Sequence, residues 1–142
     1  MIVTVDASVV IKWLLQDPRR EAGTDTATEL MRTIIIGEQP VLQPMHWLAE
    51  VAAVLARETP ITAPDDVLML TGLELPATGE PHFVRRAVEL AIELKQHVFD
   101  TLYHAVAFEN PESLLITADE RYLRAAGRKG QIVDLMDWKL PA

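Results

Sequence analysis

The first ten residues, MIVTVDASVV (1–10), contain a short apolar stretch that ends at an aspartate. Residues 2–5 are apolar and β-branched, which is typical of a strand buried on both faces. Asp6 ends this expected strand, and residues 7–15 follow as a short helix. A strand that passes directly into a helix is the first part of a βα unit, and such units build parallel sheets.

The remainder of the chain repeats this alternation, so we expect an α/β fold. It should form a single domain, residues 1–142, with a central and mostly parallel sheet flanked by helices. Pro76 argues for an edge position of the third strand, which is expected at residues 73–78. Further strands are expected at 40–42, 73–78, 113–117 and 131–135, and helices from after Pro18 to Gly37 and at 44–58, 64–72, 81–95, 99–108 and 119–127.

The composition narrows the class of protein. The chain has 142 residues, of which 49% are hydrophobic, and no cysteine, which suits one domain in a reducing cytoplasm. It shows no signal-peptide start and no apolar run of the roughly 20 residues that a membrane span needs. The net charge of −8 argues against non-specific binding of nucleic acid. However, carboxylates that hold divalent cations add to the negative total while creating a positive site.

Four acids occupy positions where a parallel sheet places its ligand sites, outside the carboxyl ends of its strands. Asp6 directly follows the first strand, and Asp119 comes two residues after the strand SLLIT. Asp100 opens its expected helix, and Glu50 lies at the edge of an apolar stripe, one turn after His46. We therefore expect the four side chains to share one crevice.

Each acid also has a purely structural interpretation. Asp6 and Asp100 suit helix N-caps or first turns, and Glu50 could be a solvated flank residue. Thr117 and Glu120 match a capping box around Asp119. The functional interpretation therefore depends on the four acids as a set.

Four carboxylates in one crevice would repel each other. Like charges ~4 Å apart cost on the order of 4 kcal/mol per pair at an intermediate effective dielectric constant. Hard oxygen ligands select Mg²⁺ or Mn²⁺, which would offset this cost. Such metals activate water and stabilise the charge that builds up on a phosphate, so the set points to phosphodiester chemistry.

Four segments resemble the acidic motifs of PIN-domain nucleases, in the order and spacing of that family. They are VTVDASVVIKWL (3–14), WLAEVAAVLAR (47–57), HVFDTLYHAVA (97–107) and LLITADERYLRAA (114–126). The compact length and the order of the motifs are similar to those of the VapC toxins of type II toxin–antitoxin pairs. The resemblance spans residues 1 to about 137.

The resemblance implies a catalytic quartet of Asp6, Glu50, Asp100 and Asp119, with Asp6, Asp100 and Asp119 holding Mg²⁺ or Mn²⁺. Ser8 and Thr117 match the family's small hydroxyl positions, with a role in positioning substrate, and Glu120 matches an accessory acid. The likeness further implies an RNA substrate, a homodimer and a VapB-like antitoxin as cognate partner.

Two other features of the sequence each allow more than one interpretation. His104 lies one turn after Asp100, where it suits either a transition-metal ligand or a polar neighbour at the rim of the site. Trp13, Trp47 and Trp138 are candidates for stacking on bases, although Trp47 lies on an apolar stripe and suits the core better.

The leading hypothesis is a cytoplasmic, Mg²⁺-dependent endoribonuclease that acts as a toxin. The alternative is a PIN-like binding or assembly module that holds metal too weakly for turnover.

Overall fold

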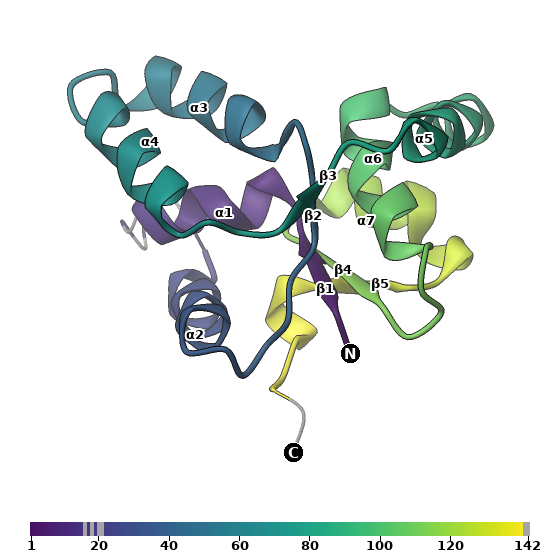
Figure 1. Ribbon diagram of the computed structural model, residues 1–142, viewed down its shortest axis with the longest axis horizontal. Helices are drawn as coiled ribbons and strands as arrows, with labels where there is room; N and C mark the ends of the chain where they lie inside the picture. Colours follow the sequence, from purple (N-terminus) through teal and green to yellow (C-terminus); the bar gives the residue numbers. More distant parts are fainter. Residues whose placement is uncertain (16, 18, 20–21, 141–142) are drawn as a thin grey trace.

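The computed structural model describes residues 1–15, 17, 19 and 22–140. Its main sheet has three parallel strands in the order β1-β4-β5, and Val5 lies opposite Ile116 in the β1–β4 pair. β1 and β4 are almost fully buried, as expected for strands covered on both faces (Figure 1). The strands are β1 (Val3–Val5), β4 (Leu114–Thr117) and β5 (Ile132–Asp134).

A second, two-stranded parallel sheet lies beside β1. It pairs β2 (Gln43–Pro44) with β3 (Ala77–Thr78), and a single bridge from Val3 to Val41 connects this part of the chain to the main sheet. The second strand was predicted at residues 40–42, and this prediction was wrong by a few residues. Pro44 belongs to β2 instead of opening a helix, because the Met45 N–H donates to the carbonyl of Thr78.

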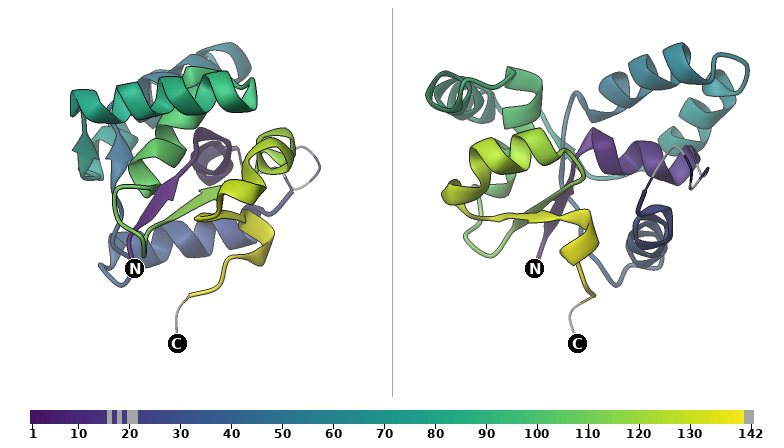
Figure 2. Two further views of the ribbon diagram at one scale, coloured as in Figure 1. Left: turned by 90° about the vertical axis from the view of Figure 1, so that its right-hand side faces the viewer. Right: turned by 180° about the vertical axis from the view of Figure 1, so that it is seen from behind.

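Helices cover the sheets from two sides, and the sheets lie between the two groups (Figures 1 and 2). Helices α1 to α4 form one group and helices α5 to α7 form the other, as the expected α/β architecture requires. The helices are α1 (Ala7–Leu14), α2 (Thr24–Ile35), α3 (Trp47–Glu58), α4 (Ala63–Gly72), α5 (Pro81–Leu94), α6 (Val98–Ala107) and α7 (Glu120–Ala126).

Helices α2 and α6 also begin at other residues than the sequence pattern indicated. α2 begins at Thr24 because Gly23 before it adopts a left-handed conformation, with φ of 78°; Pro18, after which this helix was expected to start, lies outside the described residues. α6 begins at Val98 because the imidazole Nδ1 of His97 accepts the Phe99 N–H and caps the helix. Asp100 therefore lies in the first turn of α6.

The hydrophobic core lies around β1 and β4 and includes all three tryptophans. Trp47 is 6% exposed, which confirms its assignment to the core. Trp13 and Trp138 are 3% and 7% exposed, so neither offers a surface for stacking on a base. Among the described residues, no helix is long and apolar enough to cross a membrane.

Gln43 replaces a backbone pairing on β1 where β2 diverges from it. The side chain of Gln43 is fully buried, and its amide accepts the Val5 N–H at 2.8 Å and donates to the Val5 carbonyl at 2.8 Å. Both backbone groups of Val5 are thereby satisfied without a neighbouring strand, as buried peptide groups require. Because Val5 precedes Asp6, this amide fixes the backbone from which the acidic residue extends.

We predict that Gln43→Leu destabilises the fold by about 2–4 kcal/mol, because it leaves the buried N–H and carbonyl of Val5 without partners. Chemical denaturation measures this loss. Gln96→Leu is the matched control, since Gln96 is half-buried and makes one 3.3 Å bond to the Leu94 carbonyl. Equal losses in the two variants would show that the Gln43 amide has no special role.

Candidate metal centre

Asp6 stands at the carboxyl end of β1, where the main sheet meets α1. Its backbone N–H donates to the Ile116 carbonyl of β4 at 3.0 Å, which extends the β1–β4 pairing by one residue. Its carboxylate caps α1 by accepting the Ser8 N–H at 3.0 Å and the Ser8 hydroxyl. Asp6 is thus a helix cap, and its side-chain orientation is fixed by that role.

The carboxylate of Asp6 is buried, with 7% of the residue exposed. Burial raises the pKa of Asp6 from 3.8 to about 7, against the opposing effect of the two Ser8 hydrogen bonds, and the charges of Glu50 and Asp100 add to the rise. Capping alone would not require burial of this carboxylate, because a buried charge has a high free energy.

Two further carboxylates meet Asp6 from helices on opposite sides of the sheet. Glu50 comes from the first turn of α3 and Asp100 from the first turn of α6. Carboxylate oxygens of Asp6, Glu50 and Asp100 lie within 4.8 Å of one another, close enough to share one metal ion. We call these three residues the acidic cluster. Partial burial and the charges of Glu50 and Asp119 raise the pKa of Asp100.

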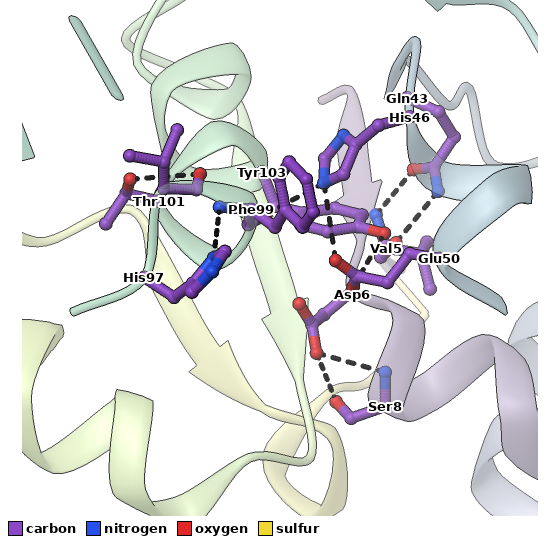
Figure 3. Close-up of polar contacts among 11 residues, drawn as sticks. Val5, Asp6, Ser8, Gln43, His46, Glu50, His97, Phe99, Thr101 and Tyr103 are labelled. Carbon is purple, nitrogen blue, oxygen red and sulfur yellow. Dashed lines mark hydrogen bonds and ion pairs between the residues drawn. The ribbon is translucent and has the colours of Figure 1, made fainter. Parts of the chain in front are cut away.

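Tyr103 and His46 hold Glu50 in place (Figure 3). The Tyr103 hydroxyl donates to Glu50 Oε1 at 3.3 Å, and His46 Nε2 lies 3.5 Å from Glu50 Oε2. His46 Nε2 also lies 2.9 Å from the Phe99 carbonyl, to which it donates. Tyr103 gave no signal in the sequence, whereas the spacing of His46 and Glu50 by four residues placed both on one helix face.

Asp119 lies near this cluster but is not one of its three members. Its carboxylate caps α7 by accepting the Tyr122 N–H at 3.0 Å, and its charge contributes to the raised pKa of Asp100. The capping box of Thr117 and Glu120 is wrong, because Asp119 itself is the N-cap. The expected role of Asp119 as a metal ligand stays a prediction. The accessory residue Glu120 is exposed in the first turn of α7.

Ser8 and Thr117 connect the elements that carry the acids. The Ser8 hydroxyl accepts the Ala118 N–H at 3.0 Å while donating to Asp6, so it joins the start of α1 to the end of β4. The Thr117 hydroxyl accepts the Asp119 N–H at 3.0 Å and lies 3.5 Å from the Ser8 hydroxyl. These contacts position the acids themselves; the expected contact of Ser8 and Thr117 with substrate stays a prediction.

His104 is not available as a metal ligand. The residue is fully buried, its Nε2 donates to the Gly130 carbonyl at 2.8 Å, and its Nδ1 accepts from the Tyr122 hydroxyl at 3.0 Å. Burial lowers the pKa of His104, which keeps the imidazole neutral in this arrangement. His104 therefore belongs to the packing between α6 and α7 and not to the rim of the site.

Acidic residues gathered at the carboxyl edge of a parallel sheet, with helices on either side, define an α/β protein with a candidate metal-dependent hydrolytic site. The sequence matches the model of the PIN domain over residues 3–128. The chain therefore belongs to the PIN-domain family, whose members are typically metal-dependent nucleases. A comparison with curated proteins gives no match.

The residues of the acidic cluster fit a divalent metal ion. All three donors are carboxylates, which suit hard cations such as Mg²⁺ and Mn²⁺. Among the described residues, His46 Nε2 lies 3.5 Å from Glu50, and no lysine or arginine is among the charges that shift the pKa values of Asp6 and Asp100. A divalent cation would supply the missing positive charge.

The metal-free protein should lose stability as pH rises from about 4 to about 7. The folded-state pKa of Asp6, about 7, lies above its ordinary 3.8, so the folded protein binds more protons in this range. The loss reaches at most about 4 kcal/mol and is complete above pH 7. Denaturation in EDTA at a series of pH values measures it. Asp6→Asn should flatten the profile, and the exposed control Asp65→Asn should not.

Manganese should raise the melting temperature, by the equivalent of about 2.7 kcal/mol at a hundredfold excess over its Kd. Asp100→Asn should lose this gain, because it removes a member of the acidic cluster. Asp119→Asn should keep a reduced gain, since asparagine still caps α7 and only a neighbouring charge is lost.

Melting curves of the wild type and both variants, each in EDTA and in manganese, separate these roles. Loss of the whole gain in Asp119→Asn would make Asp119 a direct ligand, as the family resemblance implies. An Asp100→Asn protein that manganese still stabilises fully would contradict a metal site at the cluster.

Proposed function

We propose that this protein is a metal-dependent endoribonuclease that hydrolyses RNA phosphodiester bonds with Mg²⁺ or Mn²⁺. The observation that carries the proposal is the acidic cluster, in which three carboxylates converge within 4.8 Å at the carboxyl edge of the sheet. Their electrostatic cost is unexplained by any structural role of Glu50 and Asp100. The repulsion among the three carboxylates is explained if the site binds a cation next to a phosphate.

We assign metal binding and proton transfer to different residues of the site. Asp6 and Asp100 would hold the metal, with Glu50 or Asp119 completing its ligands. When bound, a divalent cation supplies Lewis-acid stabilisation of the charge on the phosphate and promotes ionisation of the attacking water. Glu50 is oriented by Tyr103 and His46, which suits it to accept a proton from water.

The alternative is a PIN-like binding or assembly module with little turnover. The raised pKa of Asp6 keeps this alternative relevant, because a protonated Asp6 binds metal weakly. Calorimetric titration with manganese at pH 8 tests it: a Kd far above cellular metal levels, together with no turnover, would favour the binding module.

We further propose that the protein is the toxin of a type II toxin–antitoxin pair and acts in the cytoplasm. The net charge of −8 suits a basic segment of an antitoxin that lies over the acidic cluster. A homodimer is supported by an apolar stripe on α5, where Val84, Val88 and Ile92 are 47%, 40% and 74% exposed at a spacing of four residues.

Asp100→Asn should reduce metal-dependent cleavage of an RNA pool by at least about a hundredfold, because it removes a charged ligand and keeps the side-chain shape. Cleavage is measured by gel at matched manganese concentration. Asp65→Asn, an exposed acid on α4, should cleave like the wild type. Near wild-type cleavage by Asp100→Asn would contradict the proposed mechanism.

Expression of the protein alone should arrest growth, and co-expression with an adjacent small gene should relieve the arrest. Light scattering should report about twice the mass of 15.9 kDa. A strict monomer that is harmless without any partner would count against the toxin role.

A further inference from the structure

The aromatic side chains of this protein are buried, with one clear exception. The chain has three Trp, two Tyr and three Phe residues, all within the part that the structure describes. Six of them are at most 7% exposed, and Phe108 is half-buried against His104. Phe99 is 52% exposed. This exposure costs hydrophobic free energy, so a ligand that covers the ring would recover it.

Phe99 lies beside the acidic cluster. It immediately precedes Asp100 in the first turn of α6, and its carbonyl accepts from His46 Nε2, the same nitrogen that lies 3.5 Å from Glu50. Phe99 thus adjoins Asp100 along the chain and is connected to Glu50 through His46. Neither the fold nor the acidic cluster requires an apolar residue at this exposed position.

The backbone of Phe99 is anchored at both of its polar groups. The N–H donates to His97 Nδ1 at 3.1 Å, and the carbonyl accepts from His46 at 2.9 Å (Figure 3). Two imidazoles also flank the ring, with centroid distances of 5.3 Å to His46 and 4.9 Å to His97. A ring held in this way loses little conformational entropy when a ligand packs on it.

We propose that Phe99 is the base-stacking residue of this site, and that it holds an unpaired nucleobase beside the phosphate bound at the acidic cluster. The inference rests on the proposed ribonuclease function and names the group that positions its substrate. Every nucleobase offers a π-face, so a stacking residue binds bases without choosing a sequence.

Stacking would also compensate for the weak electrostatic attraction between this acidic chain and a nucleic acid. With a net charge of −8, the protein gains little from the long-range attraction that most nucleic-acid-binding proteins use. A phenyl ring attracts a base without any charge. Because bases inside a duplex are covered by their neighbours, a single exposed ring selects single-stranded RNA or loops.

The test compares two probes of equal charge and length: a short single-stranded oligoribonucleotide and an oligomer of abasic ribose phosphates. Binding is measured by fluorescence anisotropy, with calcium replacing magnesium to limit turnover. Phe99→Ala and Phe99→Leu should bind the oligoribonucleotide about tenfold more weakly, within a range of about 5- to 150-fold, and the abasic oligomer unchanged. Phe99→Trp should keep the affinity of the wild type.

Ile61→Ala is the matched control, because Ile61 is 94% exposed in the turn between α3 and α4, away from the acidic cluster. It should bind both probes like the wild type. Manganese titration and melting curves show whether the Phe99 variants keep the fold and the metal site. In cleavage assays with magnesium, the loss in kcat/KM should likewise be confined to substrates that carry bases.

Three results would overturn the proposal. The first is an affinity of Phe99→Ala for the oligoribonucleotide within twofold of the wild type. The second is an equal loss on both probes. The third is a change of mass in light scattering without any base-dependent loss, which would place Phe99 in a protein interface. A wild type that binds the oligoribonucleotide through Phe99 but cleaves no RNA would instead reject the proposed function alone.

Discussion

The buried carboxylate of Asp6 constrains the whole site. It directly follows strand β1, it caps α1, and its carboxylate lies within 4.8 Å of two other acids. A charge in that position has a high free energy, and the protein can lower it by protonation, by hydrogen bonds or by a bound cation. Ser8 supplies the hydrogen bonds, yet the pKa of Asp6 still rises to about 7. At neutral pH the protein is therefore prepared either to release a proton or to bind a metal.

The parallel sheet determines which elements can deliver the other acids. Because β1 and β4 are neighbours and run parallel, their carboxyl ends lie side by side, and the segments that leave them converge. The same hydrogen bonds that start α1 and α7 orient Asp6 and Asp119, so local folding and the placement of functional groups are one event. Glu50 and Asp100 come from helices in the two opposite groups, which makes the cluster dependent on tertiary packing.

Much of the fold and the three clustered acids were predictable from local patterns. The β-branched residues of β1 and β4 identify buried strands, and an acid directly after such a strand is positioned by the topology alone. The contacts between distant residues were not predictable. Gln43 bonds to Val5 across 38 positions and Tyr103 to Glu50 across 53, and no periodicity signals a side-chain amide that substitutes for a strand. The capping of α7 was misassigned for a related reason: Thr117 and Asp119 both suit a cap, and only the backbone path after β4 decides between them.

An acidic protein that acts on RNA must overcome repulsion at the point where it binds a polyanion. A cation at the acidic cluster reverses the sign of the local field over a few ångströms, while screening by salt limits the repulsion from the distant acids of the surface. A small metal site cannot bind the parts of the substrate that lie away from the phosphate. An uncharged aromatic surface can bind those parts at no electrostatic cost. Phe99 is the exposed aromatic residue that the described structure places beside the cluster. The metal and the ring therefore solve two separate parts of the same problem, and each would be insufficient alone.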